Sequence, residues 1–217
     1  AFRFFDAQMN SSVAEHLQLI SGMRVALQQN QFVLYYQPQF ELASGRLVGA
    51  EALLRWLHPQ QGLIAPATFI PLAEKSGLII EIGTWVLQEA CRQAVQWQQA
   101  GLPPLLMSVN LSPVQVRRAG IEQVVLDALA ESGLAAEHLE LELTESMLID
   151  DSDSLTQLLG RLRERGVGIA IDDFGTGYSN LGYLKRFAVE RLKIDQSFIL
   201  HLSEDGDNEV IVRAIIQ

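Results

Sequence analysis

Cysteine, positive charge and long apolar runs are all scarce in this chain. Its 217 residues include a single cysteine, Cys91, so no disulfide can form within the chain and a reducing compartment is expected. The formal net charge is −10, which argues against polymeric nucleic acid as a partner, because that ligand needs a broad basic surface. We find neither a signal-peptide pattern nor an apolar run of about 18 residues. These absences predict a cytoplasmic location, which includes the cytoplasmic part of a membrane-anchored protein.

The composition is that of a protein with a sizeable core. Hydrophobic residues make up 48% of the chain and charged residues 19%, and 217 residues suit one large domain or two small ones. The chain opens at Ala1 rather than at an initiator methionine, so we expect it to be cut from a longer protein. A helix predicted from about Ser12 to Gln29 would pack against the rest, and it could also connect to an upstream domain.

Strands and helices alternate along most of the chain. The first two predicted strands are joined by a short turn at 43–46, so they should pair antiparallel, and Pro38 places the first strand at an edge. From residue 105 onward the alternation predicts a parallel sheet, and 59–66 is expected to be a loop. The predicted strands are Phe32–Leu42, Leu47–Trp56, Leu105–Leu111, His138–Thr144, Val167–Asp172 and Val189–Asp195. The helices predicted after the first are Ala67–Ser76, Leu78–Ala100, Ser112–Ser132 with a break near Gly120, Ser152–Arg165, Ser179–Phe187 and Asn208–Gln217.

The fourth predicted strand carries glutamate on one face and leucine on the other. Glu140 and Glu142 alternate with leucines in the run His138-Leu-Glu-Leu-Glu-Leu-Thr. In an antiparallel sheet this would be a half-solvated strand, whereas in a barrel wrapped by helices the glutamates would point toward the barrel axis. A buried carboxylate then needs a cation, a metal ion or an opening to water.

The segment from Gly168 to Tyr178 begins with apolar residues, which are followed by Asp172 and Asp173. A loop that contains regularly spaced glycines comes next. Taken alone, it fits a strand ending in a turn as well as a strand ending in a site. Other predicted strands offer the same kind of polar face, which favours one polar site at the mouth of a barrel. The polar residues on these strands are Gln37, Gln39, Glu51, Arg55, Ser108, Asn110, Arg191, Lys193 and Asp195.

The ligand types at these strand ends narrow the chemistry. Hard oxygen donors suit Mg²⁺, Mn²⁺ or Ca²⁺, and the four histidines fall elsewhere, which disfavours zinc. Two metal ions on carboxylates would favour phosphoester cleavage. Arg55 could hold a phosphate oxygen, and Lys193 could act on water, stabilise charge, or simply pair with a neighbouring acid. The oxygen donors are Glu51, Asn110, Glu142, Asp172 and Asp173.

Together these residues resemble the EAL-domain family of cyclic di-GMP phosphodiesterases. The segment Glu51-Ala52-Leu53-Leu54-Arg55-Trp56 is similar to the signature that names the family, and further family motifs follow in order. The resemblance runs from about Leu19 to the chain end. The further motifs are Gln37-Pro38, Phe69–Glu74, Ser108–Ser112, Glu142–Ser146, Asp172–Gly177 and Leu192–Asp195.

The resemblance implies an α/β fold, a modified TIM (β/α)8 barrel whose first strand runs antiparallel to the rest. It implies a connector at 1–18 and an EAL domain at 19–217. The implied reaction is hydrolysis of cyclic di-GMP to linear pGpG at a two-metal site for Mg²⁺ or Mn²⁺, with Ca²⁺ as an inhibitor or substitute. The family's last two strand-helix units are absent from this sequence. We therefore expect a barrel that is open between the sixth strand and the first hairpin.

The resemblance also assigns roles to individual residues. The implied catalytic residues are Lys193, Glu51, Asp173 and Asp195. The implied metal ligands are Glu51, Asn110, Glu142 and Asp172 for the first metal, with Asp172 and Asp173 for the second. The implied contacts to the dinucleotide are Gln37, Leu54, Arg55 and Asp195. Glu145 would support the loop from Asp173 to Ser179.

Two alternatives to this enzyme remain at the level of sequence. The first is a non-catalytic cyclic di-GMP receptor, but such receptors lose metal ligands, and here every ligand that can be checked is present. The second is a carboxylate-metal barrel acting on another phosphoester. The segment with Phe4-Phe5 and Met9 resembles the joint after a GGDEF domain, so upstream GGDEF and sensor domains are expected in the same polypeptide, together with a homodimer.

Overall fold

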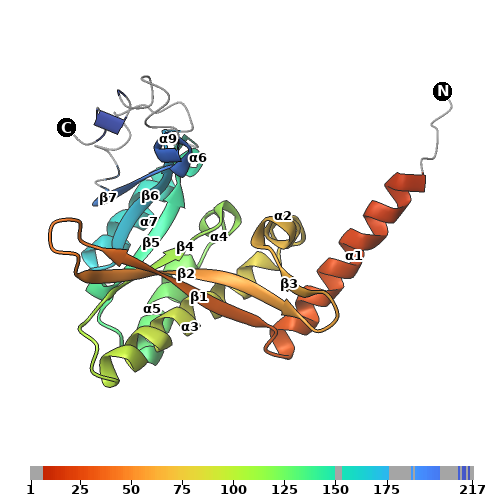
Figure 1. Ribbon diagram of the computed structural model, residues 1–217, viewed down its shortest axis with the longest axis horizontal. Coiled ribbons are helices and arrows are strands. Elements are labelled where there is room, and N and C mark those ends of the chain that lie inside the picture. The colour runs from red at the N-terminus through yellow and green to blue at the C-terminus, as the bar shows by residue number, and fades with distance from the viewer. Residues whose placement is uncertain are drawn as a thin grey trace.

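The structure is a computed structural model of the chain, and it describes residues 7–149, 153–175, 187, 189–200, 210, 212, 213 and 215 (Figure 1). Strands and helices alternate through this part of the chain. The strands are β1 (Phe32–Phe40), β2 (Leu47–His58), β3 (Gly62–Ile64), β4 (Leu106–Asn110), β5 (Leu139–Thr144), β6 (Gly168–Phe174) and β7 (Arg191–Ile194). The helices are α1 (Ala7–Gln28), α2 (Pro66–Ser76), α3 (Ile79–Gln99), α4 (Pro113–Arg117), α5 (Ile121–Ser132), the short 3₁₀ helix η1 (Ala136–His138), α6 (Glu145–Ile149), α7 (Asp153–Glu164) and α9 (Gln196–Leu200).

One sheet contains all of these strands, in the order β1-β2-β4-β5-β6-β7 with β3 attached to β2. β1 pairs antiparallel with β2, and each later neighbour pair in this order is parallel. The predicted parallel sheet with an antiparallel first strand is therefore confirmed. Pro38 lies in β1 at one end of the order, and an edge strand is where a proline is tolerated in a sheet. Among the described residues β1 and β7 are the two ends, so this wall of the barrel is open between them, as expected.

Four short elements were not predicted, namely β3, η1, α6 and α9, and η1 contains His138, which was expected to begin a strand. The segment 59–66 was expected to be a loop, yet β3 lies within it and pairs with the end of β2. His58 holds the intervening turn, because its Nδ1 accepts hydrogen bonds from the backbone N–H groups of Gln60 and Gln61, each at 3.2 Å. The helix α6 begins directly after β5, and α9 follows β7 with only Asp195 between them. Elements of three to five residues are too short to show a period in the sequence, which is why these were missed.

The helices bury the outer side of the parallel strands. Figure 1 shows α3, α5 and α7 running along this side, and α3 contacts both α5 and β4. Leu139, Leu141 and Leu143 on the outer face of β5 are completely buried, and each contributes about 1.5–3 kcal/mol by leaving water. The spacing of leucines in β5 thus fixes which side of the sheet the helices cover.

A second part of the core lies where α1 and α2 meet the β1–β2 ribbon. Phe32, Trp56 and Phe69 are buried there with ring centroids 5.6–5.8 Å apart. Gly22 lets α1 approach this cluster closely, because a Cβ at this position would lie 3.1 Å from the Trp56 ring. Figure 1 shows the other end of α1 projecting away from the body, and Leu17 on it is 62% exposed.

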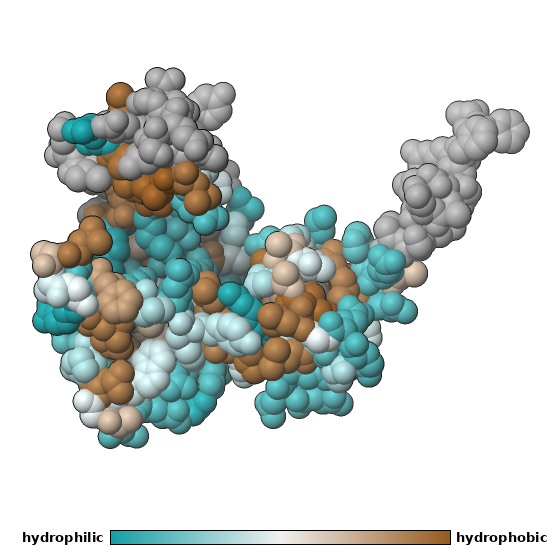
Figure 2. Space-filling model, in the orientation of Figure 1, coloured by the Kyte–Doolittle hydropathy of each residue, from teal (hydrophilic) through white to brown (hydrophobic). Residues whose placement is uncertain are grey.

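The outer surface is mixed in character. Figure 2 shows hydrophilic surface interrupted by apolar patches, and the exposed apolar residues include Tyr35, Phe40 and Leu42 on or beside β1. Within the described ranges, no helix combines the length and apolarity needed to cross a bilayer. The predicted helix Ser179–Phe187, the C-terminal helix from Asn208 and the loop 176–179 fall largely outside the described residues.

Candidate metal and phosphoester site

Adjacent strands of the sheet bring the predicted site residues to one end of the barrel wall. Glu51 comes from β2, Asn110 from β4, Glu142 from β5, Asp172 from β6 and Lys193 from β7. Parallel pairing sets Asn110 opposite Glu142 on neighbouring strands. The inward parity predicted from the sequence therefore holds for residues that are up to 142 positions apart in the chain.

Three carboxylates meet at this end. One oxygen from each of Glu51, Glu142 and Asp172 lies within 4.8 Å of the other two. Asn110 joins them by donating a hydrogen bond from Nδ2 to Glu51 Oε1 at 2.7 Å. Glu142 is 1% exposed, and its Oε1 is a buried atom that lacks a hydrogen-bond partner in the described part of the chain. Such an oxygen is costly to bury unless a ligand satisfies it.

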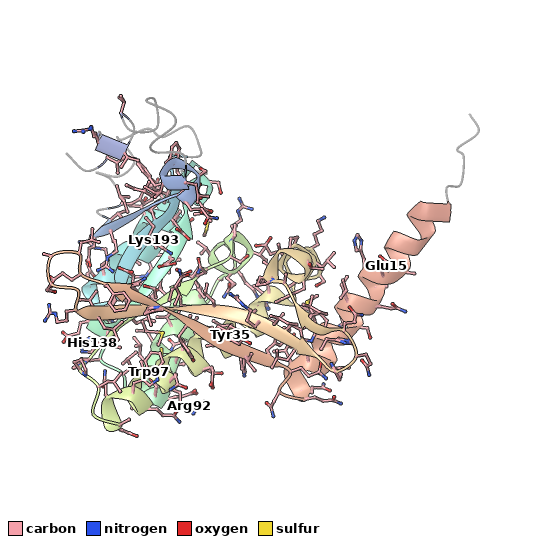
Figure 3. All side chains as sticks on the ribbon, viewed as in Figure 1. Glu15, Tyr35, Arg92, Trp97, His138 and Lys193 are labelled. Atoms are coloured by element: carbon pink, nitrogen blue, oxygen red, sulfur yellow. The ribbon has the colours of Figure 1, made fainter. Side chains whose placement is uncertain are left out.

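Lys193 lies on β7 (Figure 3), and its ammonium contacts all three carboxylates. Its Nζ lies 2.8 Å from Glu51 Oε2, 2.6 Å from Glu142 Oε2 and 3.4 Å from Asp172 Oδ2. One ammonium facing three carboxylates leaves a net negative charge that a divalent cation could balance. The donors are all hard oxygens, so the residues present fit Mg²⁺ or Mn²⁺ better than zinc.

Burial and the neighbouring charges have opposite effects on the pKa of Glu142, and likewise on the pKa of Lys193. The net result for each of these two groups is a raised pKa. Burial raises the pKa of Glu142 to about 7, although the nearby Lys193 ammonium opposes the shift. Burial by itself would lower the pKa of Lys193, but its hydrogen bonds to Glu142 and Glu51 outweigh burial and raise that pKa. Lys193 therefore keeps its proton at neutral pH, and the site holds a fixed positive charge among acids.

Asp173 and Asp195 form an acidic pair next to the cluster of Glu51, Glu142 and Asp172. Asp173 has a φ of 55°, an unusual angle for a residue other than glycine. Partial burial, then the charge of Asp172, raises the pKa of Asp173. The Ser197 hydroxyl and backbone N–H both donate to Asp195 Oδ1 and lower its pKa. A hydrogen bond joins the two carboxyl groups, so Asp173 is the member that retains a proton more readily.

Glu145 links the end of β5 to the end of β6. It opens α6, it is 6% exposed, and its Oε2 accepts a hydrogen bond from the backbone N–H of Gly175 at 2.9 Å. Gly175 has a φ of 100°, and a Cβ there would lie 2.8 Å from the Phe198 ring. Only glycine fits this position. Glu145 therefore anchors the first residue after β6, close to Asp172 and Asp173.

The β1–β2 ribbon supplies the residues expected to contact a dinucleotide. Gln37 lies directly opposite Glu51 in the strand register, on the neighbouring strand. Arg55 lies on the same side of β2 as Glu51, and its guanidinium stacks 5.4 Å from the centroid of the Tyr35 ring. Leu54 lies on the opposite side of β2 and packs against the hydrophobic core. Tyr35 is a site neighbour that was not predicted, although its alternation with Gln37 in the sequence gave the signal.

A hydrogen-bonded network behind Asn110 was also missed. Ser112 caps α4 and donates its hydroxyl to Glu74 Oε1 at 2.7 Å. The backbone N–H of Ser112 donates a hydrogen bond to Gln115 Oε1 at 3.0 Å. The Gln115 side chain also fills the space that a Cβ at Gly83 on α3 would need. The sequence signal was the capping pattern of a serine followed three residues later by glutamine. This network fixes the chain just after Asn110.

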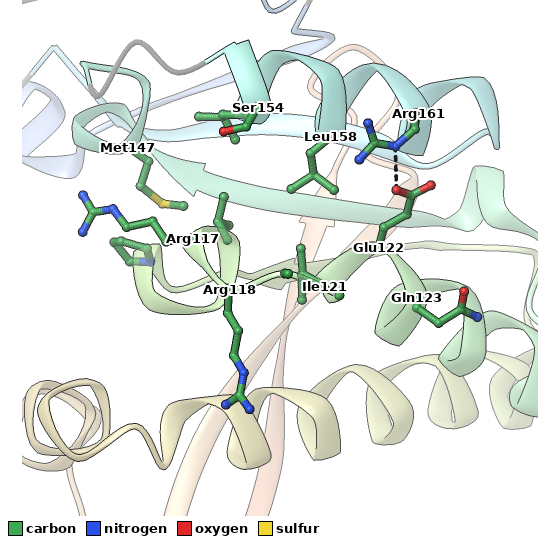
Figure 4. Close-up of a pocket in the computed structure, with 14 residues that line it drawn as sticks. Arg117, Arg118, Ile121, Glu122, Gln123, Met147, Ser154, Leu158 and Arg161 are labelled. Carbon is green, nitrogen blue, oxygen red and sulfur yellow. Dashed lines mark hydrogen bonds and ion pairs between the residues drawn. The ribbon is translucent and has the colours of Figure 1, made fainter.

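A surface hollow of about 790 Å³ lies away from these residues, between α4–α5 and α6–α7 (Figure 4). Its lining includes Arg118, Ile121 and Leu158, and at its rim Arg161 Nε lies 2.6 Å from Glu122 Oε2. The predicted site residues do not appear in the described lining of this hollow. The arrangement of the carboxylates, rather than cavity size, therefore locates the candidate site.

Comparison with known proteins points to one family. The family model described as the EAL domain matches residues 21–217. The chain is 50% identical over 213 residues to the bifunctional diguanylate cyclase/cyclic di-GMP phosphodiesterase MucR of Pseudomonas aeruginosa, covering 98% of this chain and 31% of MucR. It is 44% identical over 214 residues to the cyclic di-GMP phosphodiesterase NbdA of the same species, covering 99% of this chain and 27% of NbdA. The chain thus spans less than a third of these two relatives.

A solved structure agrees with the sequence comparison. The structure described as the PaMucR phosphodiesterase in complex with c-di-GMP matches with a TM-score of 0.88 at 50% identity. The match covers 92% of this chain and 81% of that chain.

Proposed function

Because the chain belongs to the EAL-domain family, we propose that it hydrolyses cyclic di-GMP to linear pGpG with divalent metal ions. The observation that carries this proposal is the meeting of Glu51, Glu142 and Asp172 within 4.8 Å of one another. Relatives named as cyclic di-GMP phosphodiesterases, at 50% and 44% identity, support the choice of substrate.

Metal binding is assigned to the carboxylate end of the barrel wall. Glu51, Asn110, Glu142 and Asp172 would hold the first ion, and Asp172 with Asp173 would hold the second. The unpartnered Oε1 of Glu142 supports this assignment, since a buried oxygen of this kind gains most from a cation. Bound there, Mg²⁺ or Mn²⁺ would act as a Lewis acid toward the phosphoryl group, and Ca²⁺ would substitute for them or inhibit.

Lys193 would stabilise charge rather than act as a base. Its raised pKa keeps the ammonium protonated at neutral pH, so it has no free lone pair with which to take a proton from water. An ammonium fixed among Glu51, Glu142 and Asp172 would instead donate hydrogen bonds to the phosphoryl oxygens, on which negative charge grows during the reaction.

Asp195 and Asp173 are the residues that we propose for positioning the attacking water. The lowered pKa of Asp195 keeps it ionised, so it can accept a hydrogen bond from an attacking water and orient that water. Asp173, whose pKa is raised, shares a hydrogen bond with Asp195 and would help to hold it in place. Gln37, Arg55 and Asp195 would bind the dinucleotide with their side chains, and Leu54, whose side chain packs against the core, would contact it through its backbone. Among these, Arg55 is suited to a phosphate because its guanidinium presents parallel donors.

The deciding experiment incubates the full-length protein with cyclic di-GMP and Mg²⁺ or Mn²⁺ and detects pGpG by chromatography. We expect pGpG in the wild type, and turnover lower by on the order of 10³-fold in Glu51→Ala, since a metal ion contributes several kcal/mol to the transition state. Thermal stability should remain, because a cluster of like charges loses repulsion together with the metal. The exposed Glu137→Ala is the matched control, and normal turnover in Glu51→Ala would refute the assignment.

The same experiment separates the enzyme from a non-catalytic receptor. A receptor would bind cyclic di-GMP in calorimetry without producing pGpG at any metal concentration. We propose the enzyme because Glu51, Asn110, Glu142, Asp172 and Lys193 lie together at one end of the sheet.

The setting of the domain is also a proposal. We place it in the cytoplasm, downstream of GGDEF and sensor domains in one polypeptide, and we expect a homodimer. The name of MucR as a bifunctional diguanylate cyclase and phosphodiesterase supports the pairing of domains.

A further inference from the structure

A second polar layer lies inside the barrel wall, directly below the acidic cluster. Its central residue is Glu140, which is 2% exposed and which the proposed mechanism does not use. Interior layers of such barrels are ordinarily filled by branched apolar side chains, so a buried glutamate at this position is unusual. Departures of this kind are expected near functional sites.

The layer is held by contacts that join residues of four strands, β1, β4, β5 and β7. Arg191 Nε on β7 lies 3.5 Å from Glu140 Oε2 on β5. Ser108 on β4 is completely buried and donates its hydroxyl to Glu140 Oε1 at 2.9 Å. Gln39 on β1 in turn reaches Ser108, with Nε2 to Oγ at 3.5 Å. Glu140 is therefore fully engaged on both of its oxygens.

Small residues on β6 open the path for this ion pair. β6 lies between β5 and β7 in the sheet, so Arg191 must cross it to reach Glu140. The register places Gly168 opposite Glu140 and Ala170 opposite Arg191. A Cβ at Gly168 would already lie 3.5 Å from the Glu140 Cβ, so a larger side chain would compete for the space that the pair uses.

Three members of the lower layer, on the parallel strands, each precede a site residue by two positions on the same strand. Ser108 precedes Asn110, Glu140 precedes Glu142, and Arg191 precedes Lys193. Residues two apart on a strand point to the same face, at a fixed rise along it. The Glu140–Arg191 pair thus repeats the Glu142–Lys193 pair one layer down, and it bridges the same two strands.

We propose that Glu140 and Arg191 are positioning residues, which set the separation of β5 and β7 so that Lys193 meets Glu142 and the cation site keeps its shape. This inference rests on the proposed function for its kinetic consequence but not for its effect on cation binding. Neither residue touches the reacting atoms. Their action passes through the backbone of β5 and β7.

The test uses the double variant Glu140→Gln/Arg191→Met in the full-length protein, because removing both charges avoids leaving one of them buried alone. Outer partners of metal ligands are worth about 10- to 100-fold in affinity or activity, so we expect kcat to fall by that factor while KM for cyclic di-GMP stays within about twofold. Calorimetry with Mn²⁺ alone should show affinity weakened by about tenfold. Arg191→Lys, which keeps the charge, should recover part of both losses.

The matched control is Arg163→Met. Arg163 Nε on α7 lies 3.7 Å from Glu190 Oε1, so this ion pair also holds the start of β7, but from the exposed outer side. We expect it to leave kcat and Mn²⁺ affinity unchanged. A folded double variant with wild-type kcat and wild-type Mn²⁺ affinity would overturn the inference, as would equal losses in the control.

The outcomes also separate this inference from the proposed function. If the wild type makes no pGpG but the double variant still weakens Mn²⁺ binding, the proposed function fails and the positioning layer stands. If the double variant does not fold, Ser108→Ala decides in its place, because it removes one hydrogen bond to Glu140 and keeps the ion pair. Ser108→Ala should then weaken Mn²⁺ binding severalfold, and unchanged binding would refute the layer.

Discussion

The two faces of β5 are buried to nearly the same degree and differ completely in chemistry. Leu139, Leu141 and Leu143 are 0% exposed on the outer face, and Glu140 and Glu142 are 2% and 1% exposed on the inner face. The outer face gains stability by leaving water, whereas the inner face would lose it without Arg191 and Lys193 as counter-charges. Burial alone therefore does not separate core from site in this fold. The partners of each buried group do.

The largest expected effect comes from the inner face. Glu142→Gln keeps the shape of the side chain but removes a charge from the proposed metal site, so kcat should fall by on the order of 10³-fold. Stability should change by less than about 1 kcal/mol, because Lys193 retains Glu51 and Asp172 as partners. Steady-state kinetics and urea unfolding measure the two quantities. Near-normal kcat would show that the inner face is not the site.

The neighbouring residue on the outer face should give the reverse result. Leu141→Ala leaves a cavity between β5 and its helices and should cost about 2–5 kcal/mol in the free energy of unfolding. The kcat of the remaining folded protein should stay within about twofold, because the inner face is untouched. Activity measured per folded molecule, after a urea titration of the same sample, checks this. A loss of kcat comparable to that of Glu142→Gln would mean that the two faces are not independent.

Glu145 tests how the inner face is connected to the loop beyond it. Glu145→Ala removes the acceptor for the Gly175 N–H and should loosen the end of β6 that carries Asp172 and Asp173. We expect kcat to fall by about tenfold while the Kd for cyclic di-GMP changes little, because the ribbon with Gln37 and Arg55 is intact. The exposed Glu164→Ala on α7 is a suitable control. Equal losses in kcat and affinity would instead place Glu145 in ligand binding.

The difference between the two faces of β5 could largely be predicted from the sequence, because successive side chains of a strand point to opposite faces. The parity of Glu140 and Glu142 against the leucines, together with the alternation of strands and helices, was enough to predict an inward acidic face. The same argument placed Glu51, Asn110 and Asp172 at one end of the sheet. These predictions succeeded because each depends only on local pattern and on the parallel order of strands.

The side-chain contacts that could not be predicted from the sequence depend on distances between strands. The expected ion pair of Lys193 with Glu142 is present, but that Lys193 reaches Glu51 and Asp172 as well depends on the register of β6 and β7. The role of Glu74 as the partner of Ser112 is likewise invisible in a chain where 38 positions separate them. Short elements such as β3 and α6 carry too few residues to show a period.

The last prediction concerns the outer layer again and uses its single thiol, which plays no part in the proposed activity. Cys91 on α3 is completely buried, and burial raises the pKa of its thiol to about 12. Because the thiolate is the reactive form, alkylation by iodoacetamide at pH 8 should be slower than in urea-unfolded protein by about 10³-fold or more. Mass spectrometry of the labelled chain measures this, with Cys91→Ala as the unlabelled control.

The raised pKa of the Cys91 thiol also predicts how the stability of the protein changes with pH. The folded state holds the Cys91 proton more tightly than the unfolded state, whose thiol has a pKa of about 8.5. This contribution to stability is therefore fully present below about pH 8.5 and is lost progressively as pH rises toward 12. Wild type should lose about 1–2 kcal/mol more stability than Cys91→Ala between pH 8 and pH 10. Rapid native labelling, or identical pH profiles for the two proteins, would mean that the apolar layer around α3 admits water, and the contrast between the two faces of the sheet would weaken accordingly.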